Sequence, residues 1–132
     1  MTEHNHLIVR AEVKKPFVNP SVTKNWLKRL VKEIGMKITK SGGPHVDYVD
    51  VPNNSGIAGI VMIETSHASI HVWDKANPPL VQMDVYSCKH YDVSKVLDML
   101  EEMEPTKINY MLIDRQNKLV LEHLGVEEAP PE

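Results

Sequence analysis

Residues 64–73 read ETSHASIHVW, and their alternation of polar and apolar side chains predicts a β-strand. The β-branched Ile70 and Val72 favour the same structure. Successive side chains on a strand point to opposite faces, so one face would carry the small apolar set Ala68, Ile70 and Val72. The other would carry two imidazoles, a hydroxyl and an indole, from His67, Ser69, His71 and Trp73. That composition is odd for a solvated face, although it also fits a half-buried strand whose histidines are hydrogen-bonded.

Strand-like runs on both sides extend this stretch into a sheet. They are HLIVRAEV (residues 6–13), MKIT (residues 36–39), IAGIVMIE (residues 57–64), LVQMDVYS (residues 80–87) and INYMLID (residues 108–114). Residues 40–56 are dense in turn formers and are expected to be irregular. Because the central strands follow one another through short turns, the sheet should be largely antiparallel.

Two amphipathic helices are predicted between these strands. Asn19 and Pro20 suit the cap and first position of a helix that ends at Gly35, and Asp92 suits the cap of a second helix. Apolar residues recur at helical spacing in each, namely Trp26, Leu27, Leu30, Val31 and Ile34 in the first and Val93, Val96, Leu97, Leu100 and Met103 in the second.

Strand–helix–strand therefore occurs twice, as duplicated β-α-β halves. Two helices cover only one face of an antiparallel sheet, so we expect an α+β fold built as a two-layer α/β sandwich with its helices on one face. The uncovered face predicts a sheet-to-sheet dimer. The 132 residues fit a single domain over residues 1–124, and residues 125–132 predict a disordered tail.

Composition narrows the classes of function. The formal net charge is -3 and no long run of lysine or arginine occurs, which argues against a nucleic-acid partner. No apolar run approaches the roughly 20 residues of a membrane-spanning helix. The first residues, MTEHNH, lack the basic-then-apolar layout of a signal peptide, so we expect a cytoplasmic protein without membrane contacts.

Two other interpretations of residues 64–73 fit less well. His67 and His71 would share one face of a helix, but four residues of strand span about 13 Å, too far for one zinc ion. No second Cys/His cluster occurs at ligand spacing, so no metal site is predicted. Ser66 has no glycine on either side, as the sharp turn of a serine hydrolase would need. The single cysteine, Cys88, is either a small buried residue or a reactive thiol that needs a partner.

Two motifs in register carry a family resemblance. TSHASIHVWD (residues 65–74), followed by MDVYSC (residues 83–88), resembles the prokaryotic S-adenosylmethionine decarboxylase family, and the match runs from about His6 to Asp114. The resemblance implies a self-cleaving proenzyme. The serine placed as Ser66 attacks the carbonyl of Thr65, the chain is cut between these two residues, and a pyruvoyl group forms from Ser66.

The resemblance also implies the remaining roles. The pyruvoyl carbonyl forms a Schiff base with the substrate amine and accepts the electron pair that decarboxylation leaves. His71 is expected to transfer a proton during processing, Cys88 to be the proton donor in decarboxylation, and His67 to be positional. The expected substrate is S-adenosylmethionine or a related amine-bearing molecule, bound to a homodimer of processed protomers.

Three positions depart from the family pattern. Thr65 stands where the family usually has glutamate, and Ala58 stands where it has a serine that helps processing, for which Ser55 is a candidate replacement. Lys75 occupies the place of a glutamate that holds the substrate's ribose, and the adjacent Asp74 offers another acceptor. Trp73, Tyr48 and Tyr86 complete the expected substrate-binding set, although either tyrosine also fits a core.

These departures leave two alternatives open. Lys75 motivates a pyruvoyl-dependent arginine or ornithine decarboxylase on the same scaffold. Ala58 motivates an uncleaved, non-catalytic relative that binds a ligand or pairs with an active subunit.

Overall fold

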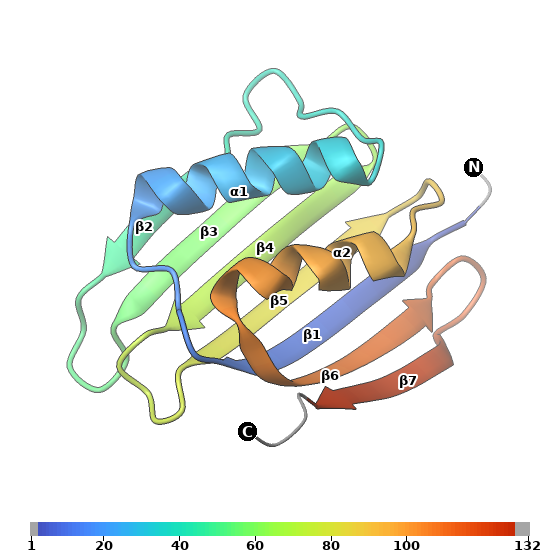
Figure 1. The fold of residues 1–132 in the computed structure, drawn as a ribbon. Helices are drawn as coiled ribbons and strands as arrows, with labels where there is room; N and C mark the ends of the chain where they lie inside the picture. The colour runs from blue at the N-terminus through green and yellow to red at the C-terminus, as the bar shows by residue number, and fades with distance from the viewer. Residues whose placement is uncertain (1–2, 129–132) are drawn as a thin grey trace.

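The computed structural model describes residues 3–128 and shows one sheet with two α-helices packed across one of its faces (Figure 1). The elements in chain order are β1 (Asn5–Val13), α1 (Pro20–Glu33), β2 (His45–Val49), β3 (Gly56–Ile63), β4 (Ser66–Trp73), β5 (Leu80–Ser87), α2 (Val93–Met99), the 3₁₀ helix η1 (Leu100–Met103), β6 (Pro105–Asp114) and β7 (Val120–Glu128). The α+β class and the helices on one face are confirmed. No helix within residues 3–128 is long and apolar enough to cross a bilayer.

The sheet has seven strands in the order β2-β3-β4-β5-β1-β6-β7, and every neighbouring pair is antiparallel. Strands β3, β4 and β5 follow one another as hairpins. β1, the first strand of the chain, lies between β5 and β6. The two predicted β-α-β halves therefore share one continuous sheet. The strand that contains the first motif, β4, is therefore held on both sides.

Capping residues begin both helices where the sequence predicts. The side chain of Asn19 accepts hydrogen bonds from the backbone N–H groups of Ser21 and Val22, and that of Asp92 accepts from Ser94. Gly35, at φ +74°, ends the first helix in a conformation that suits glycine. The buried indole of Trp26 donates to the Met99 carbonyl at 2.9 Å and ties the two helices together.

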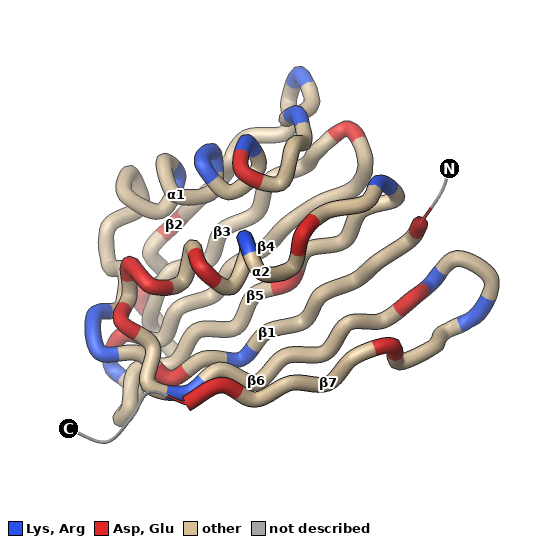
Figure 2. The backbone as a smooth tube through the Cα atoms, turned by 45° about the vertical axis from the view of Figure 1, so that its right-hand side comes forward, with Lys and Arg blue, Asp and Glu red and all other residues tan. Residues whose placement is uncertain are grey.

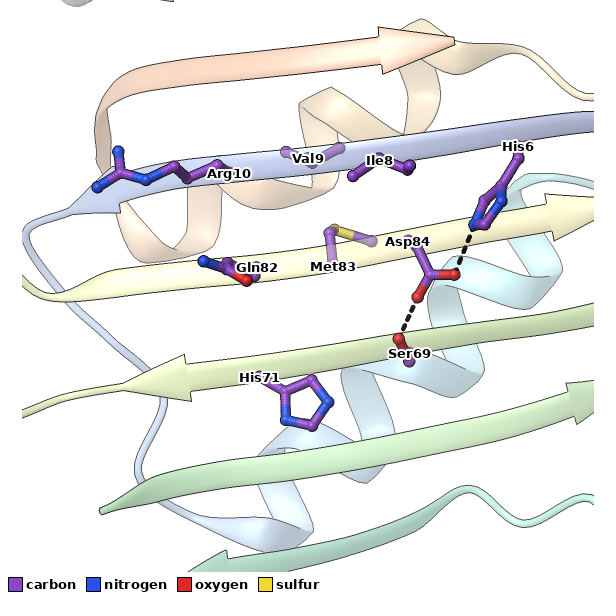
Figure 3. Close-up of a pocket in the computed structure, with 9 residues that line it drawn as sticks. All are labelled: His6, Ile8, Val9, Arg10, Ser69, His71, Gln82, Met83 and Asp84. Carbon is purple, nitrogen blue, oxygen red and sulfur yellow. Dashed lines mark hydrogen bonds and ion pairs between the residues drawn. The ribbon is translucent and has the colours of Figure 1, made fainter. Parts of the chain in front are cut away.

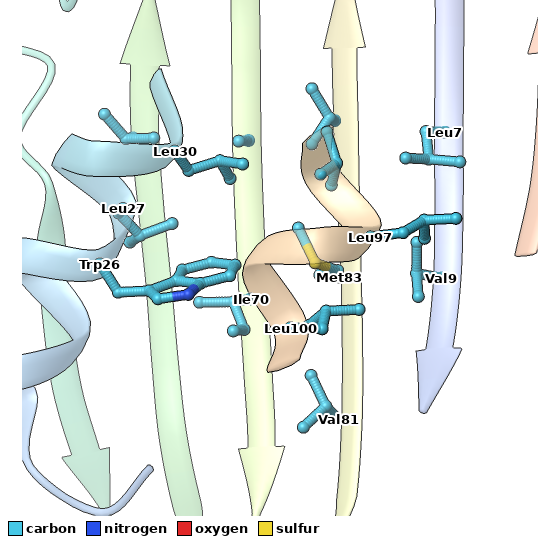
Figure 4. Packing of buried hydrophobic residues seen from close by; sticks show 14 of the residues in the cluster. Leu7, Val9, Trp26, Leu27, Leu30, Ile70, Val81, Met83, Leu97 and Leu100 are labelled. Atoms are coloured by element: carbon cyan, nitrogen blue, oxygen red, sulfur yellow. The ribbon is translucent and has the colours of Figure 1, made fainter. Parts of the chain in front are cut away.

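A single apolar core lies between the helices and the sheet. Trp26, Leu27 and Leu30 of α1 are fully buried and face Ile70 of β4 in the close-up of Figure 4. The predicted alternation along β4 is confirmed, because its buried residues are Ala68, Ile70 and Val72. The residues between them therefore project from the opposite, uncovered side of the sheet, which we call the open face.

Exposed apolar side chains gather on the open face. Ile8, Met111 and Leu124 lie opposite one another on β1, β6 and β7, and are 40%, 38% and 63% exposed. Ile60 and Met62 of β3 add two more, each 50% exposed. Charged residues, in contrast, are prominent on the helical layer. Basic residues lie along α1, and acidic residues lie along α2 and η1 (Figure 2). The sheet-to-sheet dimer stays a prediction that this apolar face supports.

Two predictions about the middle of the chain are wrong. Residues 36–39 do not form a strand, since only Ile38 makes an isolated bridge, to Ile63. Residues 40–56 are not wholly irregular, because they contain β2, which pairs along β3 from His45 opposite Ile60 to Val49 opposite Gly56. Flanking turn formers hid this edge strand, which buries Val46 alone among its five residues.

The predicted tail also begins too early. Gly125 to Glu128 belong to β7 and pair with β6, and the rest of the predicted tail lies outside the described residues. A side chain at position 125 would overlap the ring of Tyr110, so a glycine is needed at this crossing. Residues 120–128 are almost wholly exposed, and a strand without a buried face gives little sequence signal.

Gly125→Val is expected to lower the free energy of unfolding by about 1–3 kcal/mol, because the added side chain overlaps the Tyr110 ring. Chemical denaturation measures the change. Glu127→Val, on the same strand and exposed, is the control and should stay within about 0.5 kcal/mol of the parent. Equal small effects of both substitutions would show that residues 125–128 do not pair as β7.

Candidate active site

The predicted cut lies at the tight turn between β3 and β4. Ser66 is the first residue of β4, lies opposite Ile63 on β3 and Ser87 on β5, and has φ +150°. A side chain at this φ is uncommon and costs on the order of 1–3 kcal/mol. The surrounding strand pairing holds it there, so backbone strain is located at the bond expected to break.

Cys88 lies directly beside this bond. Its backbone N–H donates to the carbonyl oxygen of Thr65 at 2.9 Å. Tyr86, two residues earlier, lies opposite His67 in the register of β4 and β5. The structure therefore brings together four of the predicted residues, which we call the cleavage-site cluster: Thr65, Ser66, Tyr86 and Cys88.

His71 lies far from this cluster within the same chain. It is five residues along β4 from Ser66, which corresponds to about 16 Å of strand. Its exposed ring projects from the open face, opposite Ala58, and stacks on Trp73 with 6.0 Å between ring centroids. His71 therefore cannot exchange a proton with the hydroxyl of Ser66 in its own protomer.

The remaining predicted substrate residues lie around the far end of β4, on β4 itself, in the loop after it and on β2. Tyr48 donates its hydroxyl to both carboxylate oxygens of Asp74, at 3.0 and 3.2 Å, and its ring packs against the edge of the core. The indole of Trp73 donates to Asn54 at 2.8 Å. Lys75 lines a cavity of about 470 Å³ beside Trp73. We call the group His71, Trp73, Asp74 and Tyr48 the far-end cluster.

Ser55 does not replace the missing hydroxyl at Ala58 within one chain. Its Oγ donates to the carboxylate of Asp50 and to the carbonyl of Val51, at 3.2 and 2.9 Å, in the loop before β3. That loop is at the opposite end of β3 from the turn, about 26 Å from Ser66 at the rise of a strand. Ala58 itself faces His71, so the cleavage-site cluster contains no contribution from either residue.

A hydrogen-bonded network on the open face was missed by the sequence analysis (Figure 3). His6 Nε2 lies 2.7 Å from one oxygen of Asp84, Ser69 donates to the other, and His67 Nε2 lies 3.4 Å from the first oxygen. Arg115 donates to His6 Nδ1 at 3.2 Å and lies over the ring of Tyr86, 4.0 Å from its centroid. The residues come from β1, β4, β5 and the end of β6, so no local motif contains them.

The network keeps Asp84 ionised. Burial alone would raise the pKa of Asp84, but hydrogen bonds from His6 and Ser69, together with the two nearby histidines, outweigh burial and hold this pKa below its usual range. His67 follows the predicted cut, so its contact with Asp84 fits the positional role expected of it.

His6, His67 and Asp84 are also residue types that bind metals, and their donor atoms lie within 4.8 Å of one another. The position of the His6 proton, however, does not fit a metal site. Arginine only donates, so His6 Nδ1 accepts from Arg115 and His6 Nε2 carries the proton directed at Asp84. A metal would need a lone pair on that same nitrogen.

A shallow pocket of about 460 Å³ connects the network to the far-end cluster. Its lining residues on the open face are His6, Ile8, Arg10, Ser69, His71, Gln82 and Asp84 (Figure 3). This volume is in the range of small-molecule sites. The pocket is open toward the side where a second sheet is expected.

The fold has a counterpart among solved structures. It matches the crystal structure of an adenosylmethionine decarboxylase from Aquifex aeolicus with a TM-score of 0.61 and 24% sequence identity, over 92% of this chain and 96% of that one. Sequence then gives the family: the S-adenosylmethionine decarboxylase pattern matches residues 6–116, and the chain belongs to this family.

Two archaeal relatives agree with this assignment. An S-adenosylmethionine decarboxylase proenzyme of Archaeoglobus fulgidus is 33% identical over 95 residues, which cover 67% of this chain and 78% of the relative. A proenzyme of the same name from Pyrococcus horikoshii is 29% identical over 127 residues, which cover 94% of this chain and 80% of the relative. The resemblance found in residues 65–88 is thereby confirmed at the level of the family.

Asp84→Asn should make the fold less sensitive to acid. Because the folded-state pKa of Asp84 is lowered, its ionised form stabilises the fold above the usual carboxyl pKa, and this contribution is lost as the pH falls through the lowered value. Unfolding free energies at about pH 5 and about pH 3 should therefore differ more for the parent than for the variant. Asp47→Asn, exposed on the edge strand β2, should behave like the parent. Identical acid sensitivity of all three proteins would contradict the network.

Proposed function

We propose that this chain is a pyruvoyl-dependent S-adenosylmethionine decarboxylase that cuts itself between Thr65 and Ser66. Its product, decarboxylated S-adenosylmethionine, would supply polyamine synthesis. The observation that carries the proposal is the hydrogen bond from Cys88 N–H to the Thr65 carbonyl, next to the strained backbone of Ser66. The family assignment supports this activity over an arginine or ornithine decarboxylase and over an uncleaved relative.

Self-cleavage begins when the Ser66 hydroxyl attacks the carbonyl carbon of Thr65. Negative charge then develops on the carbonyl oxygen, where the N–H of Cys88 already donates a hydrogen bond. The C–N bond breaks, the amine takes the proton lost by the hydroxyl, and an ester joins Thr65 to Ser66. β-Elimination then breaks the bond between the ester oxygen and the Cβ of residue 66, which frees the Thr65 carboxylate and leaves a dehydroalanine. Water hydrolyses the imine form of that residue, ammonia leaves, and the pyruvoyl carbonyl stands at the start of residues 66–132, now separate from residues 1–65.

A pyruvoyl carbonyl at residue 66 supplies the Schiff base and the electron sink that decarboxylation requires. Residues of this chain hold that position in place. His67, beside it, contacts Asp84, and β4 remains paired with β3 and β5. Cys88, held at the same turn by its own N–H, is the proposed proton donor to the decarboxylated carbon.

A second protomer is needed to complete the site. The cleavage-site and far-end clusters lie at opposite ends of the sheet, so one chain presents two incomplete halves. A two-fold dimer that pairs the open faces with strand directions reversed would bring each far-end cluster over the partner's cleavage site. The exposed apolar side chains of β1, β3, β6 and β7 fit such an interface. His71 would then serve Ser66 of the other protomer.

The far-end cluster would bind the nucleoside part of the substrate. Asp74 is the proposed acceptor for the ribose hydroxyls, and Tyr48 positions its carboxylate rather than stacking on adenine, because its ring packs at the core. Trp73 and Tyr86 offer aromatic faces on the two halves of the composite site. One side of Tyr86 is already covered by Arg115.

Intact mass spectrometry tests the cut. The purified parent should appear as two fragments, residues 1–65 and a pyruvoyl-headed chain of residues 66–132, and should release labelled carbon dioxide from S-adenosylmethionine but not from arginine or ornithine. Ser66→Ala should remain a single uncut chain, whereas Ser21→Ala, which removes an exposed hydroxyl on α1, should still be cut. A parent that stays at full length after long incubation would overturn the proposed function.

Mixed dimers test the composite site. Ser66→Ala and His71→Ala should each remain uncut alone, the first for want of a nucleophile and the second for want of a proton-transfer group. When the two are co-expressed with different tags, the His71→Ala chain should be cut because its partner supplies His71. The Ser66→Ala chain should stay whole. Failure to cut the His71→Ala chain in purified mixed dimers would place the proton transfer elsewhere.

A further inference from the structure

A directed chain of hydrogen bonds passes through the side chain of Thr65, the residue before the proposed cut, and ends at Met36. The N–H of Lys89 donates to Ser87 Oγ at 3.0 Å, and the Ser87 hydroxyl donates to Thr65 Oγ1 at 2.9 Å. The Thr65 hydroxyl in turn donates to the sulfur of Met36 at 3.2 Å. Ser87 also lies 3.8 Å from that sulfur, but its single proton has the shorter contact with Thr65. Every proton in the chain has one acceptor.

Ser87 is placed to act on Thr65. It is fully buried, one of two buried polar residues among those described, and a buried hydroxyl has to find hydrogen-bond partners. The backbone N–H of the next residue, Cys88, holds the carbonyl oxygen of the same threonine. Residues 87 and 88 thus hold Thr65 at two points, by its side chain and by its carbonyl.

We infer that Thr65 and Ser87 are positioning residues for self-cleavage: the Ser87–Thr65 hydrogen bond sets the orientation of the carbonyl that Ser66 attacks. This inference rests on the proposed function. With the Thr65 side chain fixed by Ser87 and Met36, rotation about the bond between its Cα and carbonyl carbon is restricted. The carbonyl then stays aligned with Cys88 N–H while the oxygen of Ser66 approaches the carbon.

These two contacts matter because neither Ala58 nor Ser55, the positions considered for a further hydroxyl, reaches the Thr65 carbonyl within one chain. Ala58 carries no hydroxyl and lies opposite His71, about 16 Å along the strand from the turn. Ser55 is bonded to Asp50 and Val51 at the far end of β3. Stabilisation of the charge on the Thr65 oxygen within one protomer therefore depends on the alignment of the Cys88 amide, and small misplacements of a reacting group are costly in rate.

Removing the Thr65 hydroxyl should slow cutting without unfolding the protein. Thr65→Val keeps the shape of the side chain and should slow the appearance of fragments by about tenfold or more, whereas Thr65→Ser, which restores the hydroxyl, should stay within about threefold of the parent. Ser87→Ala should resemble Thr65→Val, and the double variant should be no slower than the slower single one. Thr106→Val, which removes a strand hydroxyl bonded to the Glu12 carbonyl, is the control and should cut normally.

A second measurement does not depend on cutting. In the uncut Ser66→Ala background, amide exchange of Cys88 reports its hydrogen bond to the Thr65 carbonyl directly. Exchange should be faster with Thr65→Val than with Thr65→Ser, while the amides of β5 keep their protection. Equal exchange in both variants, or cutting of Thr65→Val at the parent rate, would overturn the inference and leave the proposed function intact. A parent protein that stays uncut would instead contradict the proposed function. The exchange experiment would still show whether the Thr65 hydroxyl orients its carbonyl toward Cys88 N–H.

Discussion

The hydrogen bond between Cys88 N–H and the Thr65 carbonyl depends on the register of three neighbouring strands. β3 and β4 meet at a turn of two residues, and β5 lies alongside β4 with Ser87 opposite Ser66. A shift of one residue in either pairing would reverse which face each side chain of β4 occupies, and would also move residue 88 away from residue 65. The apolar residues of β4 under α1 prevent that shift, so core packing fixes the geometry of the bond between Thr65 and Ser66, where the cut is proposed.

Proximity along the chain is misleading in this site. Ser66 and His71 belong to one motif, yet an extended strand separates them by about 16 Å, whereas Cys88 is distant in sequence and touches Thr65. The strand that carries both residues is rigid because it is paired on both sides. One chain therefore cannot bring the two together by bending, and for this reason the proposed site takes His71 from a second copy of the chain.

The sequence predicted most of what depends on local patterns. Alternation in residues 67–73 located the core strand, and Asn19, Gly35 and Asp92 marked helix ends correctly. What it missed depends on pairing between distant segments or on strands without a buried face: β2 hidden among turn formers, β7 read as a tail, and the network of His6, Ser69 and Asp84. His67 and His71 are too far apart on one strand to share a zinc ion, but no local pattern indicates that His67 lies beside Asp84 of the neighbouring strand.

A self-cleaving protein has to keep its fold after its own chain is broken. The proposed cut lies in a turn between two paired strands, where a break leaves that pairing in place. The proposed cut would remove the covalent link between β3 and β4, but the pairing of these strands continues from Ile63 opposite Ser66 to Ile57 opposite Val72. On the other side, β5 pairs with the whole of β4. Residue 66 would become the first residue of the second fragment, and the next residue, His67, contacts Asp84 on the neighbouring strand. The proposed cut would therefore release the strain at Ser66 within the turn, while the residues around the new chain end would stay where the uncut chain placed them.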